Sequence, residues 1–507
     1  MGRLAERITG IQQIDSAAAA VEFERRWTTW GEIAGARARI ADELAKAGLS
    51  NDSRIGVMMR NDAKLVPAIY EVIGTRCLVT LNPILNVDKL AADVSATGVP
   101  AVVGVARDLD AELVRRALAE VGCLVLEMTG DPTNPVAVRQ QRGATNMVSA
   151  RAEAPGVALE MLTSGTTGAP KRIPMRRDAF EMAVFGTARF EKGRAQNDSP
   201  RLRSGVQLLM APLSHISGLL ALMNATVAGR AVTLLERFRV DDFRDVVSRH
   251  KIKAASIPPA ALKMVYDADV PRNELASLQA FRVGTAPLDP NLADMVYERY
   301  GIPVLQNYGA TEFGGVAGWT LDDFREHRVT RRGSVGRLNP GIAGRIVDPE
   351  SGAELPHGDA GVLELRSRQI GDGKSWTPTT DLAQLDAEGF LWILGRADNA
   401  IIRGGFKVHP DEVVRALESH PAIVEASVVG LKDPRLGQVP AAAYTLAKGA
   451  SDPGADELAG FLRGKLTSYQ VPVLFKLVDE LPRTPSLKAD QTAVKALLQP
   501  LFAAAAD

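Results

Sequence analysis

The chain has 507 residues, of which 46% are hydrophobic and 24% are charged, proportions that are ordinary for a soluble globular protein. Its length exceeds what one hydrophobic core can organise, so two or more domains are expected. Lys+Arg and Asp+Glu are equal at 60 each, so no net charge attracts nucleic acid or an anionic membrane.

The two cysteines, Cys77 and Cys123, lack neighbours at metal-ligand spacing and make no disulfide framework, so both are expected to be buried thiols. The N-terminal residues 1–7 lack the apolar core of a signal peptide. No run approaches the roughly 20 apolar residues that a membrane span needs. The expectation is therefore a cytoplasmic protein without integral membrane association.

The first 150 residues alternate helical and strand patterns. Thr28 and Thr29 precede a helical stretch that places Ile33, Ile40 and Leu44 on one face. This rhythm is typical of βα units packed on a largely parallel sheet. Strands are expected at residues 55–59, 101–105 and 124–127, and a further helix at residues 65–73.

The middle of the chain continues this rhythm. Helices are expected at residues 241–250 and 290–300, and Asp241 or Asp242 is the expected N-cap of the first. The expected strands are residues 206–210, 231–235, 253–257, 281–283 and 304–307.

After about Gly333, glycine and proline punctuate short β segments such as residues 361–366, which predicts a small antiparallel β region. The tail after Arg396, about 110 residues long, is sufficient for a small α+β domain. Its expected elements are a turn at Gly404-Gly405, helices at residues 410–419 and 458–466, a strand at residues 423–429 and a frayed end at residues 503–506. The prediction is an α/β protein: a large multi-layer N-terminal domain with mainly parallel sheets and a small β region, then a small α+β C-terminal domain.

The stretch from Thr163 to Lys171, Thr-Ser-Gly-Thr-Thr-Gly-Ala-Pro-Lys, is the most informative local motif. Its two glycines, Gly165 and Gly168, allow backbone amides to turn inward as an anion nest. Its hydroxyls and positive charge come from Ser164, Thr166, Thr167 and Lys171. The loop suits a polyphosphate, although it matches neither the Walker loop nor the dinucleotide fingerprint. A flexible surface turn is the alternative interpretation.

Six further stretches follow this loop in order: Ala211-Pro-Leu-Ser-His-Ile-Ser-Gly218, Gly284-Thr-Ala-Pro287, Asn307-Tyr-Gly-Ala-Thr-Glu312, Thr379-Thr-Asp381, Gly395-Arg-Ala-Asp398 with Gly404-Gly-Phe-Lys-Val408, and Pro482-Arg-Thr-Pro-Ser-Leu-Lys488. Together with the loop they resemble the adenylate-forming superfamily, in particular its acyl- and aryl-CoA synthetase branch. The resemblance covers nearly the whole chain. It implies an enzyme that joins a carboxylate to the α-phosphate of ATP, releases pyrophosphate and passes the acyl group to the thiol of coenzyme A.

The resemblance implies roles for residues at the phosphate end of the ATP site. Glu312 resembles the Mg²⁺ ligand of the family, a hard oxygen donor for a hard cation, and Thr166 is a second candidate ligand. A surface-loop carboxylate is the alternative for Glu312. Thr311 resembles the hydroxyl that contacts the α-phosphate. The β- and γ-phosphates would be held by Thr163, Ser164, Gly165, Thr166, Thr167, Gly168 and Lys171.

At the nucleoside end, Tyr308 resembles the ring that stacks on adenine. Asp381 resembles the carboxylate that accepts both ribose hydroxyls, and Arg396 resembles a second ribose or phosphate contact. Without the order of the motifs, Tyr308 would be interpreted as a core tyrosine and Asp381 as a turn aspartate. The remaining candidates around the base are Gly284, Thr285, Ala286 and Pro287 on its other side, with Asn307 and Gly309 beside the tyrosine.

Lys488 resembles the mobile catalytic cation that reaches the carboxylate and the α-phosphate during adenylation; by itself it would be a solvated lysine. Two reaction steps imply two geometries, so the resemblance divides the chain into residues 1–397, which bind ATP and the acid, and residues 398–507, a mobile lid. Asp398 is at the hinge position. Gly404 and Gly405 would let the pantetheine arm of CoA pass close to the backbone.

The family pattern places the acid pocket near residues 215–218, Gly284 and residues 309–315. His215 resembles a residue that lines or gates this pocket, and a hydrogen-bonded structural histidine is the alternative. Ile216 and Ser217 stand where amino-acid activators carry an aspartate, which argues against an α-amino acid. Small residues suggest room for an aromatic ring or a medium-length acyl chain, which the sequence does not separate; they are Gly284, Gly309, Gly314 and Gly315.

Four positions depart from the usual family pattern. Arg172, Thr380 and Leu487 stand where glycine is common, and Gln438 stands where glutamate is frequent. Three rival classes stay open: an adenylation enzyme that loads a carrier protein, a non-catalytic nucleotide-binding relative, and a luciferase-like oxygenase. The expected partners are ATP, CoA, Mg²⁺ and a small carboxylic acid, with no nucleic acid. A homodimer is left open.

Overall fold

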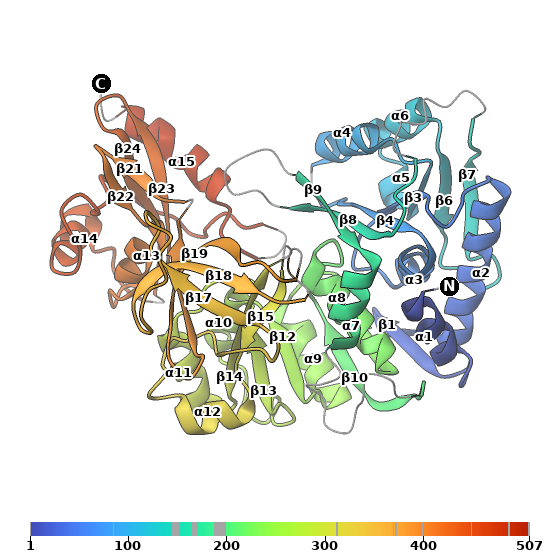
Figure 1. Cartoon of the computed structure of the whole chain (residues 1–507), viewed down its shortest axis with the longest axis horizontal. Helices are drawn as coiled ribbons and strands as arrows, with labels where there is room; N and C mark the ends of the chain where they lie inside the picture. Colours follow the sequence, from blue (N-terminus) through green and yellow to red (C-terminus); the bar gives the residue numbers. More distant parts are fainter. Residues whose placement is uncertain are drawn as a thin grey trace. The chain divides into compact units, whose positions relative to one another are not determined.

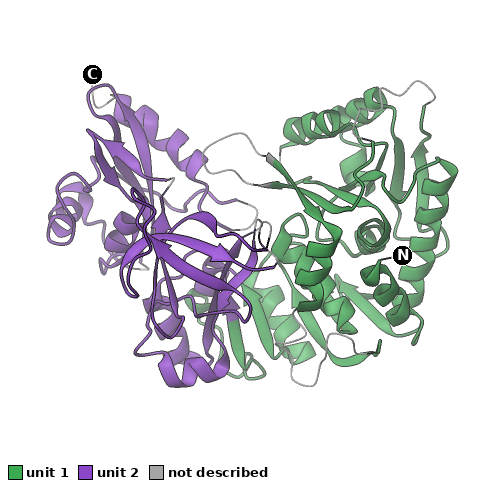
Figure 2. Cartoon of the chain, viewed as in Figure 1, with its two compact units in different colours: residues 1–165, 169–257, 264–281 green, residues 166–168, 258–263, 282–507 purple. Residues whose placement is uncertain are grey.

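The computed structural model describes residues 2–84, 86–143, 152–163, 171–186, 199–310, 313–368, 370, 373–397, 399–447, 449–484 and 487–504. By its contacts the chain divides into two compact units, which Figure 2 colours separately. Unit one comprises residues 1–165, 169–257 and 264–281, and unit two comprises residues 166–168, 258–263 and 282–507. The predicted boundary between residues 397 and 398 lies within unit two and stays a prediction.

Unit one contains a seven-stranded sheet of order β7-β6-β5-β3-β4-β8-β9. Its five inner strands are parallel, and β7 and β9 are antiparallel at the two edges. Every residue of β3, β4 and β5 is buried, as expected for parallel strands covered on both faces. The prediction of a largely parallel sheet is therefore confirmed. The strands are β3 (Arg54–Met58), β4 (Cys77–Leu81), β5 (Ala101–Gly104), β6 (Leu124–Met128), β7 (Val136–Gln140), β8 (Val157–Thr163) and β9 (Lys171–Arg176).

The local sequence explains where helix α2 (Trp30–Lys46) begins. Thr29 Oγ1 accepts a hydrogen bond from the Glu32 N–H at 3.2 Å, and Glu32 accepts one from the Thr29 N–H at 2.7 Å. This capping box satisfies two N–H groups that the helix itself leaves unpaired. The other helices described in unit one are α1 (Arg3–Gln12), η1 (Ala63–Leu65), α3 (Val66–Thr75), α4 (Val87–Thr97), α5 (Ala106–Leu109), α6 (Glu112–Val121), α7 (Arg177–Gly186), α8 (Ile216–Val227) and α9 (Val240–His250).

The prediction that Asp241 or Asp242 caps α9 is wrong. Arg239 is the N-cap residue, and both aspartates lie in the first turn of the helix. There Asp241 pairs with Arg244 at 3.3 Å and Asp242 pairs with Arg239 at 3.7 Å. Two negative charges at the helix N-terminus also interact favourably with the helix dipole, so the aspartates support the same helix end in a different way.

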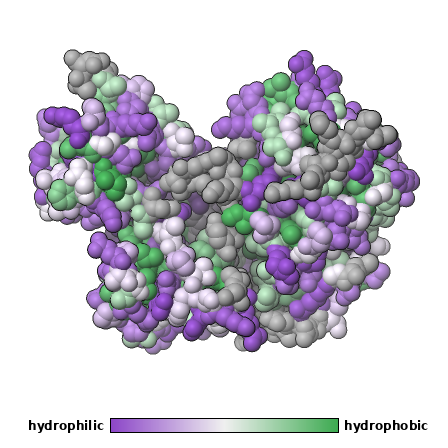
Figure 3. Space-filling view, turned by 45° about the horizontal axis from the view of Figure 1, so that its top comes forward, coloured by the Kyte–Doolittle hydropathy of each residue, from purple (hydrophilic) through white to green (hydrophobic). Residues whose placement is uncertain are grey.

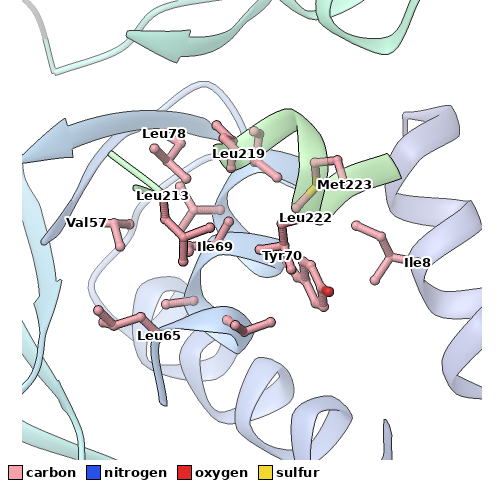
Figure 4. Close-up of a cluster of buried hydrophobic side chains, with 14 of the residues drawn as sticks. Ile8, Val57, Leu65, Ile69, Tyr70, Leu78, Leu213, Leu219, Leu222 and Met223 are labelled. Carbon is pink, nitrogen blue, oxygen red and sulfur yellow. The ribbon is translucent and has the colours of Figure 1, made fainter. Parts of the chain in front are cut away.

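A second sheet of unit one has the order β10-β11-β1-β2, and its core merges with that of the first sheet. Figure 4 shows part of this buried cluster, where Leu213 and Leu219 meet Ile69 and Tyr70 of α3. Cys77 and Cys123 are also buried, and burial raises the pKa of each thiol to about 12, which confirms the prediction of buried thiols. The strands are β10 (Arg203–Leu209), β11 (Arg230–Leu234), β1 (Ala19–Phe23) and β2 (Arg26–Thr29).

The next elements along the chain are β12 (Ala254–Ile257), α10 (Pro259–Asp267) and β13 (Ala280–Val283), whose residues are divided between the two units. In unit two, α11 (Pro290–Tyr300) leads into β14 (Val304–Ala310), which pairs antiparallel with β15 (Gly314–Gly318), and β15 pairs with β16 (Arg337–Leu338). Helix α12 (Leu321–His327) connects β15 and β16. A separate antiparallel sheet of order β17-β18-β19-β20 confirms the predicted small β region. Its strands are β17 (Ala343–Val347), β18 (Ala360–Arg366), β19 (Thr377–Leu385) and β20 (Leu391–Arg396).

The C-terminal part of unit two is an α+β arrangement built on the sheet β22-β21-β24-β23 (Figure 1). Strand β25 pairs parallel with β24 on the edge opposite β23. Neighbouring residues of β23 point to opposite faces: Val428 packs in one apolar cluster with α13 and α14, and Val429 packs in another with α15. The predicted α+β domain is confirmed, although α15 and the strands β21, β22, β24 and β25 were not predicted. The elements are β21 (Ile401–Arg403), β22 (Phe406–Val408), α13 (Pro410–Glu418), β23 (Ile423–Asp433), β24 (Gly437–Leu446), α14 (Gly454–Arg463), β25 (Leu474–Leu477) and α15 (Gln491–Ala504).

Hydrophilic and hydrophobic residues are interspersed among the described residues on the face shown in Figure 3. Among the residues that the structure describes, no helix combines the length and the apolar character needed to cross a membrane.

Candidate functional site

The predicted phosphate loop connects two paired strands of unit one. Thr163 ends β8, Lys171 begins β9, and the two residues are direct antiparallel partners, so the loop is closed at its base. Ser164, Gly165, Thr166, Thr167 and Gly168 lie outside the described residues, as do the side chains of Thr163 and Lys171. Their predicted role in holding phosphates stays a prediction.

Arg172, a departure from the family pattern, fastens the strand that leaves this loop. Its Nη1 donates to the Thr80 carbonyl at 3.0 Å, and its Nη2 pairs with Asp93 Oδ2 at 2.6 Å. Both charged groups are largely buried, and the two contacts of the guanidinium, to a carbonyl and to a carboxylate, fix its position more strictly than one contact would. The first residues of β9 are thereby tied to β4 and to helix α4.

Asn61, buried in the loop after β3, holds the segment that precedes helix α8. Its Nδ2 donates to the carbonyl oxygens of Leu235 at 2.9 Å, Ala211 at 3.2 Å and Met210 at 3.4 Å. Its Oδ1 accepts from the Leu213 N–H at 2.8 Å. One amide group thus contacts four backbone groups of two neighbouring segments, with its two N–H donors shared among three carbonyl oxygens, and no sequence pattern identified it.

His215 is the half-buried N-cap residue of α8, and its N–H donates to the Pro212 carbonyl at 2.9 Å. Gly218, in the first turn, lies against the same loop: a Cβ there would be 2.2 Å from the Pro212 oxygen and 2.7 Å from the Ala211 oxygen. Leu213 anchors the loop in the core (Figure 4). The backbone of His215 is therefore fixed, and its predicted role at the acid pocket stays a prediction.

Tyr308 and Asp381, two predicted nucleoside contacts, meet in unit two. The Tyr308 hydroxyl, on β14, donates a short hydrogen bond to Asp381 Oδ2, on β19. Burial and the neighbouring carboxylate raise the pKa of Tyr308 well above its usual range, so the hydroxyl stays a donor at any physiological pH. Phe313 packs against the tyrosine with ring centroids 6.0 Å apart.

Arg396 joins this pair from the neighbouring strand. Asp381 and Arg396 are direct partners of β19 and β20, and Arg396 Nη2 donates to Thr380 Oγ1 at 2.6 Å. The Asp381 N–H is held by Thr379 Oγ1 at 3.1 Å, and Thr379 in turn donates to a β18 carbonyl at 2.8 Å. Thr380, which the sequence identified only as a departure, therefore supplies the acceptor that orients the Arg396 guanidinium.

Gly284 to Pro287 follow β13, and this segment contains a strained backbone position. Thr285 has φ +72°, a left-handed conformation that is rare for a β-branched residue and costs roughly 1–2 kcal/mol. Gly284 lies under the Asn307 side chain, because a Cβ there would be 2.3 Å from Asn307 Oδ1. Strain that a fold retains is common at ligand-binding segments, and the predicted role of this segment at the adenine stays a prediction.

Gly309 has a structural reason to be glycine. It faces Gly315 beside a register shift between β14 and β15, and a Cβ on Gly309 would lie 2.3 Å from the Gly314 carbonyl oxygen. The absence of side chains at Gly309 and Gly284 therefore follows from close packing within the protein. The inference that these two glycines indicate room for the acid is not supported. Gly315 differs, since the nearest atom to its Cβ would be Asn339 Nδ2 at 3.7 Å.

Thr311, Glu312 and the hinge residue Asp398 lie outside the described residues. The predicted Mg²⁺ ligands, Glu312 and Thr166, are both in this group. Within the described ranges there is no group of three or more His, Cys, Asp or Glu that could hold a metal ion.

Gly404 and Gly405 form the turn between β21 and β22, with φ of +56° and +91°. Both values are left-handed, so the turn requires residues without a Cβ, and the predicted turn is confirmed. Gln438 supports the hairpin because its Oε1 accepts from the Ile402 N–H at 3.1 Å. An amide oxygen serves here as well as the glutamate that is frequent in the family.

Lys488 is exposed, and it follows a second strained residue. Leu487 has φ +62°, in the left-handed region where the family commonly has glycine, at a cost of roughly 1–2 kcal/mol. The Thr484 N–H donates to the Lys488 carbonyl at 2.8 Å, and the Lys488 N–H donates to Thr484 Oγ1 at 3.2 Å. The departure at Leu487 thus stiffens the path to the predicted catalytic lysine.

Comparison with known proteins places the chain in a family. It matches AMP-binding enzymes over residues 12–373 and the C-terminal domain of AMP-binding enzymes over residues 412–488. The chain belongs to the AMP-binding enzyme family, and its predicted membership of the adenylate-forming superfamily is confirmed. The two matched ranges leave the predicted boundary at residues 397 and 398 between them.

Individual relatives agree with this family. The chain is 27% identical over 489 residues to 2-succinylbenzoate–CoA ligase of Bacillus subtilis, covering 94% of each chain. It is 25% identical over 496 residues to 4-coumarate–CoA ligase CCL1 of Humulus lupulus, covering 93% of this chain and 89% of that protein. The solved structure of o-succinylbenzoate CoA synthetase from Bacillus subtilis, in complex with its acyl-adenylate intermediate, has a TM-score of 0.75 at 25% identity and covers 96% of this chain and 97% of that one. This likeness confirms the predicted α/β architecture.

We expect Gly309→Ala to destabilise the protein more than Gly315→Ala. The first places a methyl group 2.3 Å from a backbone oxygen, whereas the second has 3.7 Å to the nearest atom. Overpacking of this kind costs about 1–3 kcal/mol. Thermal unfolding of both variants measures the difference, with Gly315→Ala as the matched control. Equal melting temperatures would show that the β14–β15 contact does not require glycine.

We expect Asn61→Asp to destabilise unit one and to weaken acid binding. The carboxylate of aspartate keeps the acceptor for the Leu213 N–H. Its second oxygen faces the carbonyl groups that accept hydrogen bonds from Asn61 in the unaltered protein, which lowers the free energy of unfolding by about 1–3 kcal/mol. The measurements are the melting temperature and the KM values for the acid and for ATP; the acid KM should rise several-fold. Asn86→Asp is the control, since Asn86 is an exposed N-cap where aspartate serves equally well. Unchanged stability and KM would contradict the role of Asn61.

Proposed function

We propose that the chain is an ATP-dependent, AMP-forming carboxylate–CoA ligase. The observation that carries the proposal is the meeting of Tyr308, Asp381 and Arg396 on three strands of unit two, within a chain that belongs to the AMP-binding enzyme family. A flat ring, a carboxylate that accepts hydrogen bonds and a guanidinium are the groups that a purine riboside phosphate requires.

In the first step, a carboxylate oxygen of the acid attacks the α-phosphorus of ATP. A new oxygen–phosphorus bond forms, the bond to the β-phosphate bridging oxygen breaks, and pyrophosphate leaves. Negative charge gathers at the α-phosphate, so fixed positive groups accelerate this step. We assign that role to Lys488, and the binding of the leaving phosphates to the loop that ends at Lys171. Mg²⁺, when bound at Glu312 and Thr166, would neutralise part of the triphosphate charge.

In the second step, the thiolate of CoA attacks the acyl carbonyl of the acyl-AMP, and AMP leaves. Bonds now form and break at the acyl carbon and not at the α-phosphorus, so Lys488 is not required at the phosphorus. The Gly404-Gly405 turn presents backbone without side chains, which allows an extended pantetheine arm to pass close to it. Rotation of a lid comprising residues 398–507 would bring Lys488 to the site for the first step and the Gly404-Gly405 turn for the second.

For the acid, we propose an aromatic carboxylic acid, with a medium-chain fatty acid as the alternative. The aromatic acid is placed first because two relatives are named as ligases of 2-succinylbenzoate and 4-coumarate, which are both aromatic. A Cβ at Gly315 would make only an ordinary contact, 3.7 Å from Asn339 Nδ2, which is compatible with an acid that reaches this part of β15. A carrier protein in place of CoA is the second candidate for the thiol.

The test is ATP–pyrophosphate exchange with benzoate, 4-coumarate, 2-succinylbenzoate, hexanoate and octanoate, followed by thioester formation with CoA or a phosphopantetheinylated carrier protein. Exchange with an aromatic acid and a CoA thioester product is the expected result. Exchange without a CoA thioester would favour carrier loading. The absence of exchange with every acid would favour a non-catalytic nucleotide-binding protein.

We expect Lys488→Ala to lower exchange by about 10²–10³-fold, because it removes the cation that stabilises the transition state of the first step. Thioester formation from acyl-AMP supplied directly should stay within a few-fold of the unaltered enzyme. Lys476→Ala, which removes an exposed lysine from β25 of the same part of the chain, is the matched control. A loss of thioester formation as large as the loss of exchange would contradict the division of roles.

A further inference from the structure

The segment that carries Lys488 is held at both ends. On its N-terminal side, Leu481 is buried in the apolar cluster between α15 and the C-terminal sheet. On its C-terminal side, the Asp490 N–H donates to the Pro482 carbonyl at 2.8 Å, and Asp490 Oδ1 accepts from the first N–H groups of α15. Lys488 therefore lies on a short closed loop, and the geometry inside the loop decides where its side chain starts.

Arg483 is the side chain that connects this loop to the sheet. Its Nη2 pairs with Glu425 Oε2 at 2.6 Å, and its Nη1 lies 3.2 Å from Glu425 Oε1, which is a bidentate contact. The same Nη1 donates to the Leu487 carbonyl at 3.2 Å. Glu425 belongs to β23, so one guanidinium joins a strand of the C-terminal sheet to the residue directly before Lys488.

The contact to Leu487 matters because Leu487 is the strained residue of the loop. Its φ of +62° is unfavourable for a leucine, so an unrestrained loop would relax away from it. Arg483 binds the Leu487 carbonyl, and Thr484 closes the turn from the other side with its N–H on the Lys488 carbonyl at 2.8 Å. These two contacts hold the backbone of Leu487 and Lys488 in the strained conformation.

We propose that Arg483, through its ion pair with Glu425, is a positioning residue for Lys488 and serves the adenylation step. This inference rests on the proposed function, in which Lys488 acts in the first step and not in the second. Arginine is required because a planar fork can bind both carboxylate oxygens and still reach the Leu487 carbonyl, whereas lysine offers one point charge. Glutamate is required at position 425 because it presents two oxygens in that plane.

The test compares Arg483→Lys and Glu425→Gln with the unaltered enzyme in both half-reactions. We expect each variant to lower the kcat of ATP–pyrophosphate exchange by about 10- to 100-fold, since a displacement near 1 Å can have an effect of this size. The KM for ATP should change less than threefold, and thioester formation from supplied acyl-AMP should stay within twofold. The kcat of exchange in the double variant should be no lower than in the more affected single variant, because the two substitutions remove the same Arg483–Glu425 contact.

Arg463→Lys is the matched control, since it makes the same change at an exposed arginine at the end of α14. Melting temperatures and the second half-reaction distinguish positioning from general stability, because a purely structural loss lowers both half-reactions together. Such a parallel loss, or full exchange activity in both single variants, would overturn the inference while leaving the proposed function intact. An unaltered enzyme without exchange on any acid would overturn the proposed function and this inference with it.

Discussion

The hydrogen bond from Tyr308 to Asp381 is the constraint on which the proposed nucleoside site depends. It joins β14 and β19, strands of two different sheets whose bonded residues are 73 positions apart in the sequence. Asp381 is set in turn by Thr379 and by its pairing with Arg396 on β20. A ring, a carboxylate and a guanidinium therefore occupy defined positions before any nucleotide arrives, and such preorganisation reduces the entropy that binding must overcome.

Local chemistry explains why part of this structure could be predicted from the sequence. Thr29 with Glu32 begins α2, Asp289 with Pro290 begins α11, and the paired glycines at 404 and 405 make a left-handed turn. In each case the residues that determine the structure are neighbours in the sequence. The order of the motifs identified the superfamily for a related reason, since each motif is a short local arrangement.

The contacts that could not be predicted are those between distant segments. Asn61 is bonded to residues some 150 or more positions away, and Arg483 is paired with Glu425, 58 positions away. The expected cap at Asp241 or Asp242 was wrong by a few residues for a physical reason, because an aspartate stabilises a helix N-terminus from the first turn as well as from the cap. Helix α15 contains Pro500, which obscured its pattern.

All four departures from the family pattern have a structural account. Arg172 ties β9 to α4, Thr380 orients Arg396, Gln438 supports the β21–β22 hairpin, and Leu487 stiffens the Lys488 loop. Three of them replace glycine by a residue that adds a contact or restricts the backbone. The chain has thus exchanged backbone freedom around its predicted site for specific side-chain contacts. Of the glycines that it keeps, Gly309 packs against backbone atoms of β15 and Gly284 packs against the Asn307 side chain.

The most direct measurement of this account is the affinity of ATP for the Asp381→Asn variant, determined by calorimetric titration. Asparagine keeps an acceptor for the Tyr308 hydroxyl but loses the charge and one acceptor that the ribose requires. We predict that the dissociation constant rises by about tenfold, equivalent to about 1.4 kcal/mol, with an unchanged melting temperature. Asp359→Asn, at an exposed loop position, should bind ATP as the unaltered protein does. Undiminished ATP affinity in Asp381→Asn would contradict the assignment of this cluster as the nucleoside site.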